Sequence, residues 1–329
     1  MAILISGGAG YIGSHMAYHA LDLGGHVVVV DNLSTGIRKL VPGDAVFVKG
    51  NVGEQSLVET LFTRYSIDAV IHFAGSVIVP ESVADPLAYY SNNTMVARNL
   101  IEACVRGGIN RFIFSSTAAV YGTGNGKTVV AEGDSTAPIN PYGRSKLMIE
   151  WMLQDVARVR DFRFVALRYF NVAGADPKGR TGQSTPKATH LIKRACQAAL
   201  GRIPRLDIFG TDYPTRDGTG ERDYIHVADL ISAHALSLNY LRAGNTSAIL
   251  NCGYGHGTSV REVINAVERI SGDRLPVMEG PRRPGDAPAL VADNRLISET
   301  LGWRPQHDDL NEIVRSAYDW EHGLGVEDA

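Results

Sequence analysis

Short runs of hydrophobic, often β-branched residues alternate with longer amphipathic segments through the first half of the chain. Residues 2–6 and 26–31 have the composition of buried strands, and residues 13–23 between them have the pattern of a helix. Further buried strands are expected at residues 45–48, 69–73, 111–115 and 163–168, with crossover helices between them. The alternation predicts an α/β fold in which helices cover both faces of a doubly wound parallel sheet.

The sequence changes in character after Asn171, where glycine and proline become more frequent. A chain of 329 residues is long for one compact unit and suits two lobes that each bury a core. We therefore expect a first domain at residues 1–170, to which residues of about 222–250 return. A smaller C-terminal, substrate-binding lobe is expected at residues 171–329.

A glycine-rich stretch at residues 7–13, Gly-Gly-Ala-Gly-Tyr-Ile-Gly, follows the first predicted strand and opens the first helix. Backbone N–H groups at such a helix start bind a pyrophosphate, and glycine allows its close approach. The next strand ends in Asp31, whose carboxylate can accept from both ribose hydroxyls and repels a 2′-phosphate. Taken alone, the glycine-rich stretch or Asp31 could each belong to an ordinary turn that binds no ligand. Together they predict a Rossmann-like domain that binds NAD rather than NADP.

Tyr142 and Lys146 are four residues apart, which places a phenol and an ammonium on one face of a helix that begins near Pro141. A surface pair in solvent is the ordinary interpretation of this spacing. Residues 115–117, Ser-Ser-Thr, follow a predicted strand and bring a hydroxyl to the same end of the sheet. An ammonium and a positive nicotinamide ring both lower the pKa of a neighbouring tyrosine. The three side chains therefore predict a hydride-transfer site.

Composition limits the other possibilities. The 32 basic and 35 acidic residues give a net charge of -3, which does not indicate a nucleic-acid partner. Cys104, Cys196 and Cys252 fit neither a disulfide framework nor a zinc site, and the ten histidines show no metal-ligand spacing. No leader precedes Ile3, and no apolar run approaches the roughly 18 residues of a membrane span. We expect a cytoplasmic protein without a metal or a membrane partner.

With these motifs placed, the whole chain resembles the extended short-chain dehydrogenase/reductase superfamily, and within it the UDP-glucose 4-epimerase family. The superfamily resemblance is carried by residues 7–15, 31–33, 72–75, 89–93, 115–122, 141–146 and 168–171. The epimerase resemblance is carried by residues 212–215, 217–220 and 222–227.

The resemblance implies a role for each of three side chains in the reaction. Tyr142 would take the proton of the sugar 4-hydroxyl while carbon 4 gives hydride to NAD. Lys146 would tune Tyr142 and hold the nicotinamide ribose, and Thr117 would bond to the reacting oxygen. The 4-keto sugar would then turn over and recover the hydride on its opposite face, so that UDP-glucose and UDP-galactose interconvert.

The resemblance also implies two sets of binding residues. The NAD set is Gly7, Gly10, Tyr11, Ile12, Gly13, Asp31, Asn32, Asn51, Val52, Phe73, Ala74, Gly75, Asn92, Ser115, Tyr142, Lys146 and Phe170. The UDP-sugar set is Thr117, Tyr142, Asn171, His190, Phe209, Arg222, Arg283, Asp286 and Leu290. Guanidinium groups suit a diphosphate and Asp286 suits a ribose hydroxyl, although Arg222 has an ion pair with its acidic neighbours as an alternative. Adjacent Arg282 and Arg283 should point apart.

Several positions depart from the family pattern. Thr117 replaces a serine, Ala119 replaces a threonine that contacts the sugar, and Val77 replaces a lysine near the cofactor phosphates. Asn51 replaces an acid beside the adenine, and its amide oxygen can still accept a hydrogen bond. Leu290 is intermediate in size at a position where a bulky residue confines relatives to plain hexoses and a small residue admits N-acetylated sugars. UDP-N-acetylhexosamine or UDP-pentose conversion therefore stays open as an alternative.

Other functions and the assembly can be weighed in the same way. Related dehydratases carry acids after the Ser/Thr, whereas Ala118 and Ala119 follow Thr117 here. A redox-sensing NAD-binding protein without catalysis is a further alternative, but such proteins lose the Tyr/Lys pair. The family commonly dimerises through helices that correspond to residues 86–107 and 142–159, so we expect a homodimer.

Overall fold

The computed structural model describes residues 1–185, 188–283 and 285–325. The chain divides into two compact units, which are described separately. Unit 1 consists of residues 1–120, 140–168 and 231–250, and unit 2 of residues 121–139, 169–230 and 251–329. Residues 186, 187, 284 and 326–329, which the predicted C-terminal lobe includes, lie outside the described part.

A seven-stranded sheet with the strand order β12-β7-β5-β4-β1-β2-β3 forms the centre of unit 1. Its strands are β12 (Ala248–Cys252), β7 (Arg163–Tyr169), β5 (Arg111–Ser115), β4 (Ile67–His72), β1 (Ala2–Ser6), β2 (His26–Asp31) and β3 (Val46–Lys49). The pairings from β7 through to β3 are all parallel. The order reverses between β1 and β4, and such a switch point is where ligands bind in doubly wound sheets.

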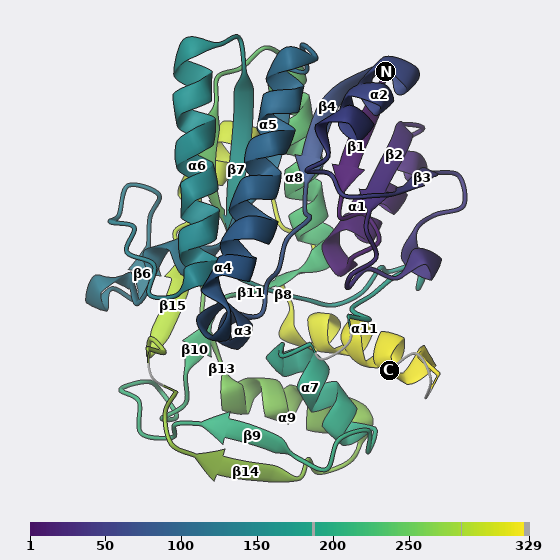
Figure 1. The fold of residues 1–329 in the computed structure, drawn as a ribbon. Coiled ribbons are helices and arrows are strands. Elements are labelled where there is room, and N and C mark those ends of the chain that lie inside the picture. Colours follow the sequence, from purple (N-terminus) through teal and green to yellow (C-terminus); the bar gives the residue numbers. More distant parts are fainter. Residues whose placement is uncertain (186–187, 284, 326–329) are drawn as a thin grey trace. The chain divides into compact units, whose positions relative to one another are not determined.

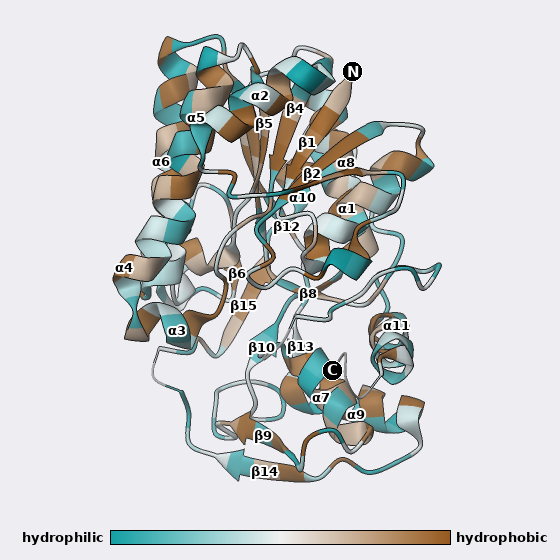
Figure 2. Ribbon diagram, turned by 45° about the vertical axis from the view of Figure 1, so that its right-hand side comes forward, coloured by the Kyte–Doolittle hydropathy of each residue, from teal (hydrophilic) through white to brown (hydrophobic). Residues whose placement is uncertain are grey.

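Helices cover both faces of this sheet, as Figure 2 shows. On one face lie α2 (Gln55–Tyr65), α5 (Val96–Arg106) and α6 (Pro141–Val159). Leu100, Phe112 and Leu153 are fully buried in the core between these helices and the strands. On the other face lie α1 (Tyr11–Asp22) and α8 (Val227–Arg242), of which residues 231–242 belong to unit 1. The predicted doubly wound α/β fold is confirmed.

The helical segment before α5 is not regular. It consists of α3 (Val79–Ala84), α4 (Pro86–Tyr89) and a π-helical turn, η2 (Tyr90–Met95), and it packs against α6. One helical region was expected over residues 86–107, so the π-helix is a feature that hydrophobic periodicity did not predict. Wide turns of this kind are frequent at functional sites.

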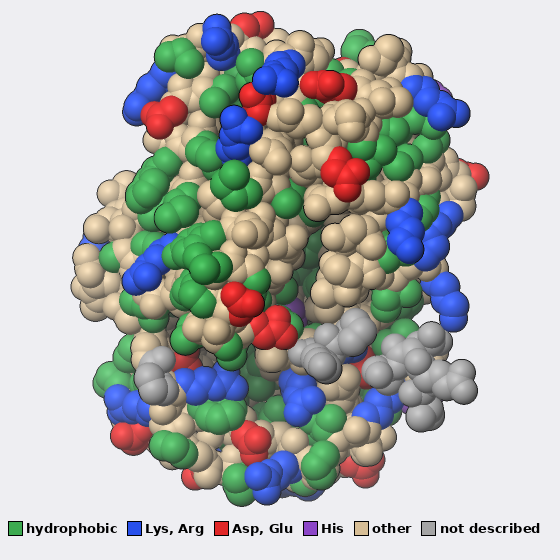
Figure 3. Space-filling view, in the orientation of Figure 1, with side chains coloured by type: hydrophobic (Ala, Val, Ile, Leu, Met, Phe, Trp, Pro, Cys, Tyr) green, Lys and Arg blue, Asp and Glu red, His purple; other side chains and the backbone are tan. Residues whose placement is uncertain are grey.

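Large hydrophobic side chains are exposed on this helical layer. Val83 on α3, Leu87 on α4, Met95 on η2 and Trp151 on α6 each expose more than half of their surface. Figure 3 shows hydrophobic side chains gathered over the face that α5 and α6 present in Figure 1. Such clustering is typical of a surface that another chain covers.

Unit 2 combines small sheets with a helical cluster. Its sheets are β13-β10-β15-β6, β11-β8 and β14-β9. The strands are β6 (Val129–Val130), β8 (Asn171–Ala173), β9 (Leu206–Phe209), β10 (Glu221–Arg222), β11 (Tyr224–His226), β13 (Thr258–Ser259), β14 (Val277–Gly280) and β15 (Ala289–Ala292). Helices α7 (Leu191–Ala199), α9 (Val260–Ser271) and α11 (Leu310–Gly323) pack on one another, and α10 (Arg295–Leu301) follows β15.

The short helical turns complete the described elements. They are η1 (Arg38–Leu40), η3 (Ala118–Tyr121) and η4 (Gly124–Gly126). Within the ranges that the structure describes, no helix combines the length and apolar character that crossing a bilayer requires.

Candidate functional site

The switch point is built by two loops whose backbones touch. Gly7 follows β1 and Ala74 follows β4, and a Cβ on Gly7 would lie 2.6 Å from the Ala74 nitrogen. Gly7 also has a φ of +72°, which a residue with a Cβ adopts only with strain. Beneath them Ser6 Oγ and His72 Nδ1 are 2.6 Å apart. The ends of β1 and β4 are therefore locked to each other.

The start of α1 has the shape of a phosphate cradle. A Cβ on Gly13 would lie 2.3 Å from the Gly7 carbonyl oxygen, so the helix start packs directly on the glycine loop. At Gly10, the residue before the helix, a Cβ would meet only that same oxygen, at 3.2 Å. No side chain caps the helix at Gly10. Open space before uncapped helical N–H groups fits a dinucleotide pyrophosphate.

Asp31 ends β2 as predicted and is buried. Its carboxylate accepts hydrogen bonds from the backbone nitrogens of Ala9 (2.9 Å) and Leu33 (2.8 Å), which tie it to the glycine loop. An ionised carboxylate has about four acceptor positions, so it retains capacity for ribose hydroxyls. Gly36 lies against the carboxylate, since a Cβ there would stand 2.8 Å from Oδ1.

The remaining predicted NAD residues of unit 1 lie at the same edge, apart from Asn92 in η2 and Tyr142 and Lys146 on α6. They follow the carboxyl ends of strands: Tyr11 and Ile12 after β1, Asn32 after β2, Asn51 and Val52 after β3, Phe73 and Gly75 after β4, and Ser115 ending β5. Asn51 Oδ1 accepts from the Gly53 nitrogen at 2.9 Å, which uses one acceptor position of the oxygen expected to face adenine. Phe170 follows β7 and is assigned to unit 2.

Tyr142 stands in the first turn of α6, which begins at Pro141 as predicted. Asn140 caps this helix by accepting from the Gly143 nitrogen at 2.9 Å. Tyr142 is buried, and its phenol and Thr117 share a side-chain hydrogen bond. Thr117 Oγ1 also accepts from the Ala119 nitrogen at 3.1 Å, which leaves its one hydroxyl hydrogen to donate toward Tyr142.

Burial sets the direction in which the pKa of Tyr142 is shifted. Burial raises it, and the hydrogen bond from Thr117 opposes that rise only in part. The lowering expected from the sequence required Lys146 together with a bound nicotinamide ring, and the ammonium of Lys146 has other contacts. Lys146 Nζ donates to the Ser115 carbonyl oxygen at 3.0 Å and lies 5.0 Å from the centre of the Phe114 ring.

Lys146 is itself unusual because its ammonium is buried. Burial lowers its pKa to about 8. The same burial, with Lys146 close by, lowers the pKa of His72 to about 3, so this imidazole is neutral. A Cβ on Gly75 would stand 3.7 Å from Lys146 Nζ, which shows how closely the loop after β4 approaches the ammonium.

Asn93, which the sequence reasoning missed, holds this loop together with the predicted Asn92. Asn93, in the π-helical turn, is fully buried. Its Oδ1 accepts from the Ser76 nitrogen at 2.7 Å, and its Nδ2 donates to Ser76 O and to Ser145 Oγ, both at 3.0 Å. The predicted Asn92 instead donates to Ser76 Oγ at 2.9 Å. The polar run Ser-Asn-Asn-Thr within a helical region was the available signal.

In unit 2 the structure brings three predicted substrate residues together. Arg222 on β10 and Leu290 on β15 are paired in parallel register. Arg222 Nη2 lies 3.6 Å from Asp286 Oδ1, and Nη1 donates to the Glu221 carbonyl oxygen at 2.8 Å. The ion pair considered from the sequence, with the neighbours Glu221 and Asp223, is not the one formed.

The adjacent Arg282 and Arg283 have different partners. The guanidinium carbon of Arg283 lies 3.7 Å from the centre of the Phe209 ring, so two predicted substrate residues stack on each other. Arg282 donates to Asp212 Oδ1 at 2.7 Å and lies over the ring of Tyr213. Tyr213 was not predicted, yet its buried hydroxyl has no hydrogen-bond partner within the described residues.

The other predicted substrate residues of unit 2 are His190 and Asn171. Burial and Lys193 both lower the pKa of His190, and Gln183 lies 3.2 Å from its Nδ1. Asn171 starts β8 and donates its backbone N–H to Asp223 O at 2.9 Å. Neither bonds to the Arg222–Asp286 pair in the contacts described.

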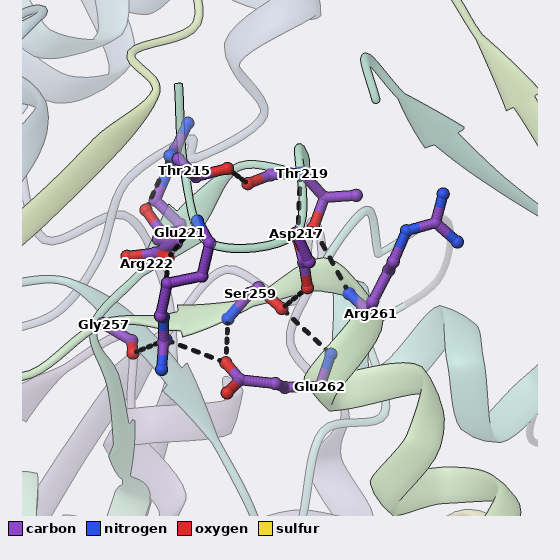
Figure 4. Close-up of polar contacts among 10 residues, drawn as sticks. Thr215, Asp217, Thr219, Glu221, Arg222, Gly257, Ser259, Arg261 and Glu262 are labelled. Atoms are coloured by element: carbon purple, nitrogen blue, oxygen red, sulfur yellow. Dashed lines mark hydrogen bonds and ion pairs between the residues drawn. The ribbon is translucent and has the colours of Figure 1, made fainter. Parts of the chain in front are cut away.

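A polar network fixes the loop that precedes Arg222 (Figure 4). Asp217 accepts from Thr219 Oγ1 at 2.7 Å and from Ser259 Oγ at 2.5 Å. Ser259 and Glu262 form a reciprocal capping box at the start of α9. Gly218 between the partners has a φ of +81°, which favours glycine. The motif at residues 217–220 thus joins its loop to α9 and to strand β10.

The described ranges contain no group of three or more His, Cys, Asp or Glu residues arranged to hold a metal ion.

Comparison with known proteins agrees with this geometry. Residues 3–253 match the NAD dependent epimerase/dehydratase family. The chain is 55% identical over 322 residues to a UDP-glucose 4-epimerase of Azospirillum brasilense, a match that covers 98% of this chain and 92% of the relative.

Solved structures give the same result for the fold. A UDP-glucose 4-epimerase from Brucella ovis in complex with NAD has a TM-score of 0.94 and 44% identity, with 97% of each chain covered. A UDP-glucose-4-epimerase from Stenotrophomonas maltophila with bound NAD and formylated UDP-arabinopyranose has a TM-score of 0.94 and 39% identity, with 98% of each chain covered.

We expect Lys146 to titrate at about 8, below the ordinary range of a lysine, because burial penalises its charge. Carbon-13 NMR of the full chain labelled at the lysine Cε atoms should show one resonance with that midpoint, and Lys146→Met should lack it. Titration of every lysine above about 10 would contradict the assignment.

Proposed function

This chain belongs to the NAD dependent epimerase/dehydratase family, and on that premise we propose that it interconverts UDP-glucose and UDP-galactose by inverting carbon 4. The observation that carries the proposal is the arrangement on α6. A buried phenol bonds to Thr117 at the end of β5, and a buried ammonium lies one helical turn away. The full-length match to UDP-glucose 4-epimerases supports this choice within the family.

In the proposed reaction Tyr142 Oη accepts the proton of the 4-hydroxyl and later returns it. NAD, when bound, supplies the hydride acceptor and donor for carbon 4. Thr117 donates its hydroxyl hydrogen toward the phenol oxygen, which favours the phenolate. Lys146 contributes a buried positive charge, which also favours a negative oxygen in a water-poor site.

The same residues support NAD as the resident cofactor. The uncapped start of α1 and the open side of Gly10 fit the pyrophosphate, and the carboxylate of Asp31 fits the adenosine ribose hydroxyls. A buried negative charge at that position disfavours a 2′-phosphate. The relative from Brucella ovis was solved with NAD bound.

The UDP part of the substrate is assigned to unit 2. Arg222 and Arg283 supply guanidinium groups for phosphate, and Phe209 supplies an aromatic ring for stacking. Asp286 is half-exposed and can accept from a ribose hydroxyl while it holds Arg222. Asn171, His190 and Leu290 complete the proposed set.

A dehydratase reaction is disfavoured by the residues after Thr117. Expulsion of the 6-hydroxyl needs a proton donor there, and Ala118 and Ala119 have none. The family description covers both reactions, so these two positions decide in favour of the epimerase.

Replacement of Tyr142 by phenylalanine should reduce turnover of UDP-galactose by about two to four orders of magnitude, because the general base is lost. Bound NAD should remain, since the phenol oxygen is a small part of the cofactor site. Tyr318→Phe serves as a control, and UDP-glucose formation is the measurement. Near-normal turnover by Tyr142→Phe would remove this residue from the mechanism, and an inactive wild-type chain would favour a non-catalytic NAD-binding protein.

The sugar preference should follow the volume at Leu290. We expect UDP-galactose to be converted fastest, with slower conversion of UDP-N-acetylgalactosamine or UDP-arabinose. Leu290→Ala should raise the rate for the N-acetylated sugar relative to UDP-galactose by about tenfold, because it makes room for the acetamido group. Each 4-epimer is quantified separately. An unchanged ratio would mean that Leu290 does not contact the sugar.

A homodimer through α3 to α6 is also proposed. The exposed side chains of Val83, Leu87, Met95 and Trp151 support it, since two copies of such a face can cover each other. Sedimentation should give the mass of two chains for the wild type and of one chain for Trp151→Glu. The control Leu23→Glu changes another large hydrophobic residue that is more than half exposed, after α1. Dimers in all three proteins would place the interface elsewhere.

A cytoplasmic location is proposed on the cysteines. Cys104, Cys196 and Cys252 are buried free thiols, which suits a reducing compartment. Cell fractionation tests this location.

A further inference from the structure

The end of β5 makes three successive hydrogen bonds to one face of α6. The Ser115 carbonyl oxygen accepts from Lys146 Nζ at 3.0 Å. Ser116 Oγ donates to Glu150 Oε1 at 2.5 Å. Thr117 bonds to the Tyr142 phenol. The reaction as proposed uses the outer two contacts, and the middle contact is so far without a role.

Glu150 is joined to the two reacting side chains by its position on the helix. It follows Lys146 by four residues and Tyr142 by eight, so all three side chains share one face of α6. Glu150 has no exposed surface in the described chain. A buried carboxylate requires a strong partner, because burial of an isolated charge is very unfavourable.

Arg168 on β7 is that partner. Its Nε donates to Glu150 Oε1 at 3.0 Å and its Nη2 to Oε2 at 2.6 Å, in the bidentate arrangement typical of arginine with a carboxylate. Arg168 is 4% exposed. The Ser116 nitrogen also donates to the Leu167 carbonyl oxygen at 2.9 Å, so β7 holds both Ser116 and the group to which Ser116 bonds.

Stability alone does not account for such a pair. The cost of desolvating two buried charges often exceeds their attraction, and well-packed apolar side chains are frequently as good. The best-attested benefit of a buried ionic group is that it fixes one register between elements. Here the elements in register are the strand end that carries Thr117 and the helix that carries Tyr142.

We propose that Glu150, held by Arg168, is a positioning residue that fixes residues 115–117 against α6 through Ser116. This inference rests on the proposed function for its kinetic consequence. Without the contact, the strand end would be free to shift along α6, and the Thr117 hydroxyl would lose its alignment with the phenol. A displacement of about 1 Å at a reacting group costs up to about a hundredfold in rate.

Ser116→Ala and Glu150→Asp test the proposal with little change in volume. Ser116→Ala removes the middle contact and keeps the Glu150–Arg168 pair. Glu150→Asp keeps the charge but shortens the side chain, so the carboxylate no longer reaches both partners. Each variant should lower kcat at least about tenfold with KM little changed, because substrate binding is not the affected step. The double variant should be no slower than the slower single variant, since both substitutions remove the same contact between Ser116 and Glu150.

A spectroscopic readout separates positioning from general stability. The phenol pKa of Tyr142, obtained from ultraviolet difference titration against Tyr142→Phe, should rise in both variants because the aligned Thr117 donor is lost. The acidic limb of the kcat profile should move to higher pH, since the base must be deprotonated to act. The control is Asp68→Asn, which breaks another bidentate pair of unit 1, with Arg242 (2.7 and 2.9 Å). It should lower Tm and leave the phenol pKa unchanged.

The outcomes distinguish this proposal from the proposed function. If the wild type fails to epimerise UDP-galactose, the function is wrong, and the phenol titration still tests the contact. If the phenol pKa and kcat of both variants equal those of the wild type, or change only as far as Asp68→Asn changes them, Glu150 has a structural role alone and the proposal is overturned.

Discussion

The close approach of the loops after β1 and β4 is the constraint on which the rest of unit 1 depends. Gly7 and Ala74 meet backbone to backbone, and Gly13 packs on the Gly7 carbonyl. A side chain at Gly7 would separate the two loops at the point where the strand order reverses, and one at Gly13 would push α1 away from the glycine loop. Because these contacts fix where α1 begins, they also fix the cradle at Gly10 and the carboxylate of Asp31, which accepts from the glycine loop. A site for a dinucleotide follows from backbone packing before any ligand is present.

Burial then sets the chemistry of the groups around that cradle. It raises the pKa of the Tyr142 phenol and lowers that of the Lys146 ammonium, so burial favours the uncharged form of both groups. His72 remains neutral beside Lys146, which avoids a second positive charge in the same buried region. The Glu150–Arg168 pair is neutral as a whole. The protein thus provides one buried cation close to the end of β5, where the proposed reaction generates a negative oxygen.

The sequence predicted the parts of the molecule that follow from local patterns. Strand and helix periodicity located the sheet, and Pro141 marked the start of the helix that carries Tyr142 and Lys146. It could not predict contacts between distant segments. Asn93 bonds to Ser76, 17 positions away, and Arg168 bonds to Glu150, 18 positions away. The π-helical turn that carries Asn93 was not predicted either. The spacing of Tyr142 and Lys146 likewise does not show that burial raises the pKa of the phenol, or that the ammonium donates to the Ser115 carbonyl oxygen.

The division of roles between the units explains why one fold serves several reactions. The cradle, the acid on β2 and the Tyr/Lys pair depend on the sheet of unit 1, and they support hydride transfer from any suitably held alcohol. The choice of alcohol depends on strands of two to four residues and on loops in unit 2, where Arg222 and Leu290 are paired in register. In the proposed function, the choice between inversion and elimination is assigned to the two residues after Thr117, because elimination needs a proton donor for the departing hydroxyl. Ala119 donates its backbone N–H to Thr117 Oγ1 instead, and so it orients the hydroxyl toward the phenol. In this proposal Ala118 and Ala119 supply no acid for elimination, and the backbone of Ala119 orients the Thr117 hydroxyl that faces Tyr142.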